Sequence, residues 1–118
     1  MKILIVDDSK AMRMIVMRTL RQAGIDATVT EAEDGQDGLE KARAGSYDLI
    51  LSDWNMPRML GIEFLQALRA DGDRTRFGFV TSESNPDMSQ MAVDAGASFM
   101  ISKPFNATSF ELALAGRS

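Results

Sequence analysis

The 118-residue sequence contains no cysteine and no histidine. The absence of cysteine excludes disulfide bonds and thiolate chemistry, and a chain without either residue type lacks the usual ligands of zinc. The absence of histidine removes the commonest general base and excludes phosphohistidine on this chain. No apolar run approaches the ~20 residues of a transmembrane helix, and the apolar part of MKILIVDDSK is too short for a signal peptide. We therefore expect a cytoplasmic protein with no membrane contact.

Basic charge is also scarce, with 13 Lys and Arg against 17 Asp and Glu, for a net charge of -4. Proteins that bind nucleic acid or anionic membranes normally carry a basic patch, so neither is expected as a direct partner, although a local patch can exist within that sum. The hydrophobic share of 45% and the charged share of 25% are ordinary for a globular protein. The length suits one domain, residues 1–118.

Short apolar runs alternate with segments of helical period. The apolar runs predict strands at Lys2–Val6, Ala27–Thr30, Asp48–Ser52, Phe77–Thr81 and Ser98–Ser102. Helical spacing and Gly or Pro at the ends predict helices at Lys10–Ala23, Gln36–Ala44, Gly61–Ala70, Pro86–Ala95 and Thr108–Ala115. Continuous apolar strands favour a parallel sheet buried on both faces. The alternation predicts an α/β doubly wound fold, since a (β/α)₈ barrel needs roughly 250 residues.

Polar and charged side chains follow four of the five predicted strands. Asp7 and Asp8 follow the first strand and Asp53 follows the third, while Thr81 ends the fourth and Lys103 follows the fifth. Ligands of an open parallel sheet bind outside the carboxyl ends of its strands. Each residue alone has an ordinary explanation, such as a helix cap or a turn. Their occurrence at four strand ends predicts one shared site.

This set of side chains is suited to a metal ion and to phosphoryl chemistry. Clustered carboxylates repel one another unless a cation lies among them, and oxygen ligands suit Mg²⁺. A lysine supplies a point charge for a phosphate, and a hydroxyl can donate to one of its oxygens. Aspartate is a known covalent acceptor of phosphoryl groups, and phosphoryl transfer needs mainly positioning and charge neutralisation.

Four segments carry a resemblance to a known family: ILIVDDSKAMR, DLILSDWNMPRMLG, FVTSE and AGASFMISKPF. In order and spacing they resemble the receiver domain of two-component response regulators, over essentially the whole chain. The segment DWNMP is similar to that of stand-alone chemotaxis receivers. The resemblance implies a CheY-like, flavodoxin-like fold with strand order 2-1-3-4-5 and five flanking helices, which agrees with the pattern of elements.

The resemblance also implies a metal site and a phosphoacceptor. Asp53 would accept the phosphoryl group. Asp8, Asp53 and the backbone carbonyl of Asn55 would coordinate Mg²⁺ directly, and Asp7 would act largely through a metal-bound water.

Further roles follow by the same resemblance. Lys103 would form an ion pair with the phosphoryl group. The Lys103–Pro104 peptide bond would be cis. Thr81 would move to hydrogen-bond a phosphoryl oxygen and so report its presence. The side chains of Asn55 and Glu83 would tune the lifetime of the aspartyl phosphate.

Met100 departs from the family pattern. The family usually has Tyr or Phe at this position, three residues before the lysine, and that ring turns inward on activation. Phe99 cannot substitute, because neighbours in a strand face opposite sides. Methionine is adaptable, so an inward swing by Met100 stays open. Met88, Met91 and Met100 serve either core packing or an adaptable partner surface.

The resemblance implies a signalling switch that phosphorylates and dephosphorylates itself and is not a turnover enzyme. The phosphoryl donor would be a sensor histidine kinase or a phosphotransfer protein. An output protein would bind the face made by the fourth helix, fifth strand and fifth helix. We expect a monomer or a weak phosphorylation-dependent dimer. Because the sequence ends just after the last predicted helix, it fits a stand-alone regulator or a receiver excised from a longer multidomain regulator.

Three other functions fit the sequence less well. A phosphohydrolase of the aspartate type typically has a second acid two residues after the nucleophile, where this chain has Asn55. A receiver-like module that is not phosphorylated would lose part of the acidic set, which is complete here. A nucleotide- or flavin-binding domain would show a Gly-rich loop after the first strand, and none follows Val6.

Overall fold

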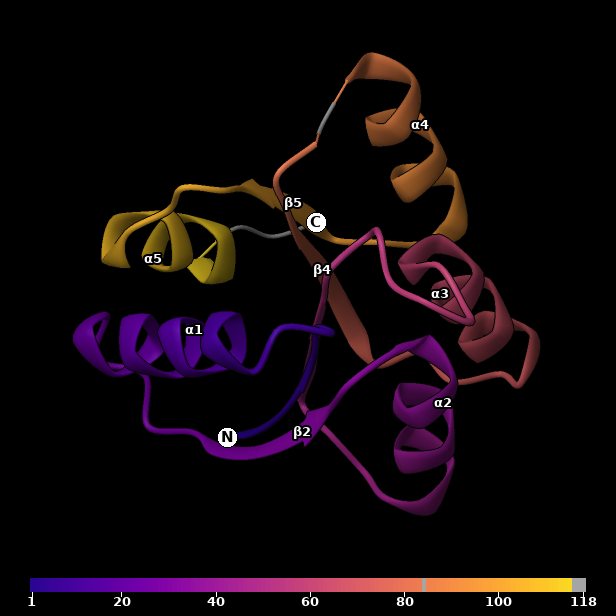
Figure 1. Ribbon diagram of the computed structural model, residues 1–118, viewed down its shortest axis with the longest axis horizontal. Coiled ribbons are helices and arrows are strands. Elements are labelled where there is room, and N and C mark those ends of the chain that lie inside the picture. The colour runs from indigo at the N-terminus through magenta and orange to yellow at the C-terminus, as the bar shows by residue number, and fades with distance from the viewer. Residues whose placement is uncertain (84, 116–118) are drawn as a thin grey trace.

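Five parallel strands form one sheet in the order β2-β1-β3-β4-β5 (Figure 1). The computed structural model describes residues 1–83 and 85–115, so Ser84 and residues 116–118 of the predicted domain lie outside the described part. The strands are β1 (Lys2–Val6), β2 (Thr28–Ala32), β3 (Leu49–Ser52), β4 (Arg76–Thr81) and β5 (Phe99–Ser102). The helices are α1 (Lys10–Gln22), α2 (Gly35–Ala44), α3 (Gly61–Ala70), α4 (Pro86–Ala95) and α5 (Ala107–Ala115). The predicted fold class and strand order are confirmed.

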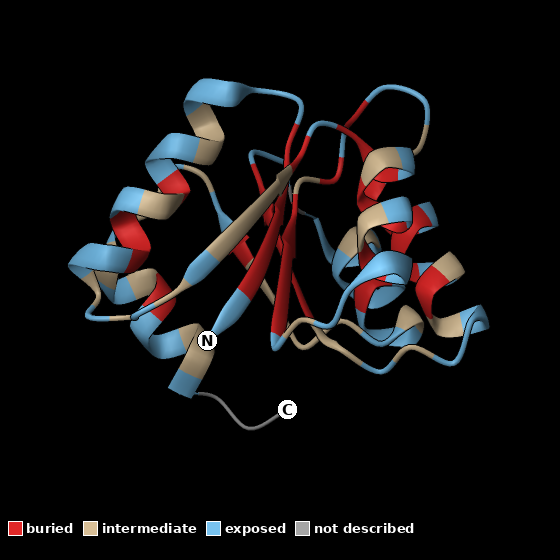
Figure 2. Ribbon diagram, turned by 90° about the horizontal axis from the view of Figure 1, so that it is seen from below, coloured by how far each residue is buried: buried red, intermediate tan, exposed pale blue. Residues whose placement is uncertain are grey.

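Both faces of the sheet are covered by helices. Helices α1 and α5 lie together on one face, and α2, α3 and α4 lie on the other (Figure 1). Alternate strand residues serve the two sides: Ile3 and Ile5 pack with the α1–α5 layer, and Leu4 and Val6 pack with the α2–α4 layer. Figure 2 shows buried strands between helices whose outer sides are exposed. Burial on both faces explains the continuous apolar runs of the inner strands β1 and β3.

Strand β2 differs most from its predicted bounds. The prediction ended at Thr30, but the strand continues to Ala32, which pairs with Val6 at the end of β1. The extension was not predicted because strands were inferred from apolar runs and the charged Glu31 interrupts this one. Its side chain lies beside Arg13 of α1, with a distance of 2.8 Å between Glu31 Oε1 and Arg13 Nε. An ion pair thus replaces an apolar contact at this position.

The helix ends follow local chemistry. Asn85 caps α4 by accepting the Met88 N–H, Pro86 opens the helix, and Gly96 ends it at φ 97°. Asn106 accepts the Ser109 N–H at the start of α5. Within the described residues no helix has the length and apolar character needed to cross a bilayer.

Candidate functional site

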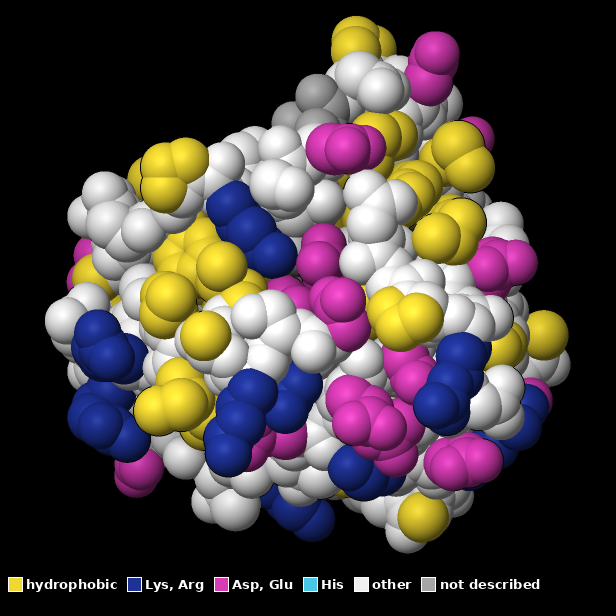
Figure 3. Space-filling view, in the orientation of Figure 1, with side chains coloured by type: hydrophobic (Ala, Val, Ile, Leu, Met, Phe, Trp, Pro, Cys, Tyr) yellow, Lys and Arg dark blue, Asp and Glu magenta, His cyan; other side chains and the backbone are white. Residues whose placement is uncertain are grey.

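Three carboxylates converge at the carboxyl ends of β1 and β3. One oxygen from each of Asp7, Asp8 and Asp53 lies within 4.8 Å of the others. Asp7 is buried, Asp53 is half-buried and Asp8 is exposed. Acidic side chains gather in the middle of the face shown in Figure 3, with basic side chains beside them. This all-oxygen set open to solvent has the chemistry that Mg²⁺ prefers.

Lys103 brings a positive charge from the end of β5 to two of these carboxylates. Its Nζ lies 3.2 Å from Asp7 Oδ2 and 3.4 Å from Asp53 Oδ2. The side chain is only 15% exposed, so water screens this charge weakly. The Lys103–Pro104 peptide is cis, as the resemblance implied. The ammonium is therefore held within the acidic cluster.

The β3–α3 loop fixes the Asp53 carboxylate. The Asp53 N–H donates to the Val6 carbonyl at 2.9 Å, which ties the strand end to β1. The Trp54 N–H donates to Asp53 Oδ1 at 2.7 Å, so one oxygen is held by the backbone. The Gly61 N–H donates to the Trp54 carbonyl at 2.8 Å and closes the loop. A Cβ on Gly61 would lie 2.1 Å from the Asp53 carbonyl oxygen, so only glycine permits this approach.

Asp7 is held by contacts that the sequence analysis did not foresee. Its Oδ1 accepts the Ser9 N–H at 2.9 Å, just before α1. Arg13 donates to the Asp7 backbone carbonyl at 2.6 Å and also pairs with Glu31, so one guanidinium joins the site to β2. No spacing of residues in the sequence indicated this link between α1 and β2.

Burial raises the pKa of Asp7 above its ordinary value of 3.8, and the negative charge of Asp53 acts in the same direction. The Ser9 N–H and the Lys103 ammonium oppose this shift by stabilising the charged form. The proton is therefore held more tightly in the folded state than in the unfolded state.

Thr81, at the end of β4, is buried beside the start of the β4–α4 loop. Its Oγ1 accepts the Glu83 N–H at 3.4 Å, and its carbonyl accepts the Lys103 N–H at 2.9 Å. Glu83 and Asn55 are exposed, on the loops that follow β4 and β3. Both side chains are thus free to meet a ligand at the strand ends.

Met100 and Phe99 lie on opposite faces of β5, as strand alternation predicts. Met100 is half-buried against the α2–α4 layer, while Phe99 packs with the α1–α5 layer. Met88 packs against the same core as Met100, whereas Met91 is 47% exposed on α4. Met88 and Met100 therefore contribute to core packing while staying partly exposed, and Met91 is the most exposed of the three.

The raised pKa of Asp7 leads to a prediction about stability. With EDTA present, we expect the free energy of unfolding of the wild type, measured relative to Asp7→Asn, to rise as pH falls from 7 toward 3.8. The reason is that the folded state binds a proton that the unfolded state lacks in this window, so stability falls as pH rises through the folded-state pKa. Because only one proton is involved, this free-energy difference can change by at most about 1.4 kcal/mol per pH unit. Urea unfolding at several pH values measures it, and a difference that falls with decreasing pH would contradict the assignment.

The sequence matches the family model for the response regulator receiver domain over residues 3–115. It is 42% identical over 109 residues to the chemotaxis protein CheY of Pseudomonas aeruginosa, covering 91% of this chain and 87% of the relative. It is 40% identical over 113 residues to the chemotaxis protein CheY-3 of Vibrio cholerae, covering 94% and 86%.

Solved structures agree with these relatives. The structure of Vibrio cholerae CheY4 superposes with a TM-score of 0.84 at 38% identity, covering 97% of this chain and 95% of that one. The receiver domain of the putative regulator NarL from Mycobacterium tuberculosis gives a TM-score of 0.85 at 28% identity, with 97% and 92% covered. The chain belongs to the response regulator receiver domain family. Its similarity is to the CheY-like chemotaxis receivers, which places it in two-component signalling.

Proposed function

We propose that this receiver is a phosphorylation switch in which Asp53 accepts a phosphoryl group from a phosphohistidine on another protein. The observation that carries the proposal is the convergence of three carboxylates and Lys103 at the strand ends. The donor is a sensor histidine kinase or a phosphotransfer protein, since this chain has no histidine. The chemotaxis relatives favour a stand-alone regulator in the cytoplasm over a receiver within a longer regulator.

The acidic cluster fits Mg²⁺. Asp8, Asp53 and the Asn55 backbone carbonyl would hold the ion directly, and Asp7 would contribute through a water. When bound, the ion supplies positive charge that reduces repulsion between these carboxylates and the incoming phosphoryl oxygens. Lys103 supplies only one positive charge to three carboxylates, so the cluster retains the excess negative charge that a divalent cation needs.

The residues of this chain position the acceptor and neutralise charge. Asp53 Oδ1 is held by the Trp54 N–H, while Oδ2 faces the Lys103 ammonium. The phosphorus–nitrogen bond of the donor breaks as a phosphorus–oxygen bond forms to the Asp53 carboxylate. Lys103 then pairs with the phosphoryl oxygens, which Thr81 can also reach as a hydrogen-bond donor.

The aspartyl phosphate is then lost by hydrolysis, and the flanking Asn55 and Glu83 tune its lifetime. Because Asn55 stands where a phosphohydrolase would have its second acid, the protein acts as a signalling domain and not as a turnover enzyme.

The switch would reach a partner through the α4–β5–α5 face. The Thr81 hydroxyl oxygen accepts the Glu83 N–H, so a movement of this hydroxyl would shift the beginning of the β4–α4 loop. The Met100 side chain packs from β5 against the α2–α4 layer, and it would follow that movement in place of the usual aromatic ring. Val93 on α4 is 66% exposed and Leu112 on α5 is 71% exposed, so this face offers apolar contacts to an output protein. We propose a monomer or a weak phosphorylation-dependent dimer.

Incubation with acetyl phosphate, a small phosphoryl donor, tests the proposed function. With millimolar Mg²⁺ we expect intact mass spectrometry to show the gain of one phosphoryl group per chain. With EDTA the gain should disappear, because the carboxylates would then repel the phosphoryl oxygens without compensation. An equal gain with and without the ion would contradict the role of Mg²⁺, and no gain in either case would contradict phosphoryl acceptance itself.

A further inference from the structure

Helix α1 is basic in an acidic protein. Its 13 residues contain four basic side chains and no acidic one, although the chain has a net charge of -4. Arg13 is occupied by Glu31 and the Asp7 carbonyl. Arg18 and Arg21 have no hydrogen bond or ion pair with any residue in 1–83 or 85–115. Two cations on one helix are therefore available to an external anion.

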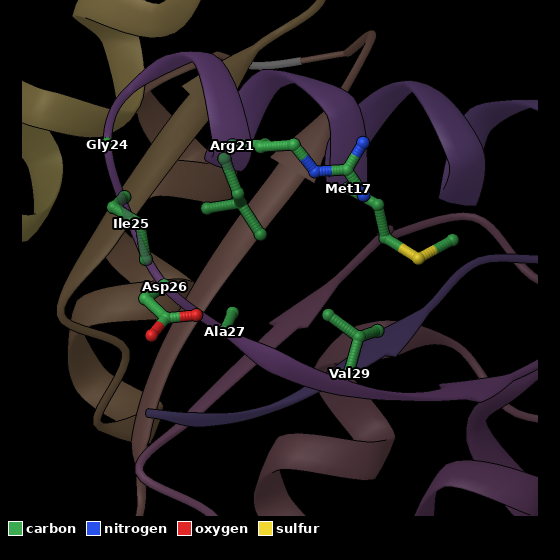
Figure 4. A pocket seen from close by; sticks show the side chains of 8 residues that line it. Met17, Arg21, Gly24, Ile25, Asp26, Ala27 and Val29 are labelled. Carbon is green, nitrogen blue, oxygen red and sulfur yellow. The ribbon is translucent and has the colours of Figure 1, made fainter.

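Arg21 borders a groove between α1 and the outer strand of the sheet, and Arg18 borders an adjoining hollow on the surface of α1. A cavity of about 360 Å³ is lined by the last turn of α1 and the segment leading into β2, including Met17, Arg21, Ile25 and Val29 (Figure 4). A second cavity of about 280 Å³ is lined by Met14, Met17, Arg18 and Arg21. The two cavities share Met17 and Arg21 and therefore adjoin each other; together they are named the α1–β2 groove.

The surface of the α1–β2 groove combines apolar side chains with Arg18 and Arg21, and one carboxylate, Asp26, lies where the chain leads into β2. Met17, Ile25 and Val29 are half-buried, so each offers part of its apolar surface to a ligand. In Figure 4 the Arg21 side chain extends along the helix toward Met17, and Val29 lies opposite on the strand. A ligand with both apolar and acidic groups would be complementary to this lining.

The groove runs beside an open sheet edge. Strand β2 pairs only with β1, where the Thr28 N–H donates to the Met1 carbonyl and the Ala32 carbonyl accepts the Asp7 N–H. Because backbone groups alternate in direction along a strand, Val29 directs its N–H and carbonyl to the open side. The Glu31 carbonyl also points outward, and it accepts a hydrogen bond from the Lys41 ammonium.

Little else protects this edge. The strand has no proline, and its register with β1 is uninterrupted, so no bulge turns it away from a partner. An open edge beside an apolar depression is the arrangement used by proteins that bind peptides through strand addition.

We propose that the α1–β2 groove binds an extended acidic and apolar segment of a partner protein, which adds a strand to β2. The backbone of the segment would bond to the open groups of Val29. Its side chains on the α1 side would enter between Met17 and Val29 and bring carboxylates to Arg18 and Arg21. A second copy of this chain fits less well, because symmetric pairing of two β2 strands would bring the free arginines of both copies toward each other. The proposal does not rest on phosphorylation at Asp53, because no residue that lines the groove belongs to the acidic cluster.

A peptide titration tests the proposal. The probe is a capped eight-residue peptide in which glutamate alternates with valine, added to ¹⁵N-labelled protein and followed by NMR. We expect saturable shifts of the Val29 and Glu31 amides and of the Arg18 and Arg21 side chains. Arg21→Glu should weaken binding by about fivefold, the loss of one strong surface ion pair. The matched control is Arg74→Glu, an equal change of charge at an exposed arginine outside the groove, which should bind as the wild type does.

Two further probes separate strand addition from simple charge attraction. A peptide with lysine in place of glutamate and a peptide with N-methylated backbone amides should both fail to shift Val29. If the N-methylated peptide shifted the Val29 amide as much as the unmodified peptide does, strand addition would be overturned. If Arg21→Glu bound the unmodified peptide as tightly as the wild type does, the role of the groove would be overturned. A protein that dimerises through β2 without peptide, with Val29 at the contact, would show a second copy as the occupant and overturn the proposal.

Discussion

Asp53→Asn is expected to abolish phosphoryl incorporation from acetyl phosphate and Mg²⁺. The amide lacks the anionic oxygen that would bond to phosphorus, and it lacks the charge that faces Lys103. The rate should fall by at least about a thousandfold, as it does when other covalent nucleophiles are removed. The fold should persist, because asparagine retains an oxygen that can accept the Trp54 N–H. Intact mass spectrometry over time measures the effect.

The control for this variant is Asp26→Asn, which makes the same change at an exposed aspartate outside the acidic cluster. Asp26→Asn should gain the phosphoryl group at the wild-type rate. An undiminished gain in Asp53→Asn would show that another residue is the acceptor. Circular dichroism of both variants confirms that any loss comes from chemistry and not from unfolding.

Gly61→Ala is expected to lower the free energy of unfolding by about 3 kcal/mol, at the upper range for overpacking. The added Cβ would lie 2.1 Å from the Asp53 carbonyl oxygen and 3.0 Å from a ring carbon of Phe79. The first of these contacts is with backbone, so the conflict cannot be relieved by a side-chain rotation. Moving the loop would also displace the Asp53 carboxylate, so phosphorylation should slow as well. Urea unfolding gives the stability and acetyl phosphate labelling gives the rate.

Gly45→Ala is the matched control for stability. Its Cβ would lie 3.4 Å from the nearest atoms of Tyr47, which is an ordinary contact, and Gly45 has a φ of -138° that alanine adopts without strain. Its stability should stay within about 0.5 kcal/mol of the wild type. If Gly61→Ala were as stable as Gly45→Ala, the close approach of Gly61 to the Asp53 carbonyl in the β3–α3 loop would be wrong.

The fold could be predicted from the sequence because its signals are local. Strands β1, β3, β4 and β5 contain apolar runs, and helices begin or end near residues with a clear preference, such as Pro86 and Gly96. The convergence of Asp7, Asp53 and Lys103 could also be predicted, because parallel strands bring their carboxyl ends to one edge. These inferences need only strand order and direction, not side-chain packing.

Other features depend on contacts between distant segments and could not be predicted. Arg13 joins α1, β2 and the acidic site through Glu31 and the Asp7 carbonyl, a link that no local pattern indicates. Strand β2 also continues past Glu31 to Ala32, which pairs with Val6 of β1. The need for glycine at position 61 arises from the Asp53 carbonyl, eight positions earlier in the chain. Such constraints emerge only when the chain is folded.

The most direct test of the account is to locate the phosphoryl group on the wild-type chain. After labelling with acetyl phosphate and Mg²⁺, borohydride reduction converts an aspartyl phosphate to homoserine, and tandem mass spectrometry of the peptides finds the modified position. The account predicts modification at Asp53 alone. Modification at Asp8, or a stable phosphate on a serine or threonine with Asp53 unchanged, would contradict it.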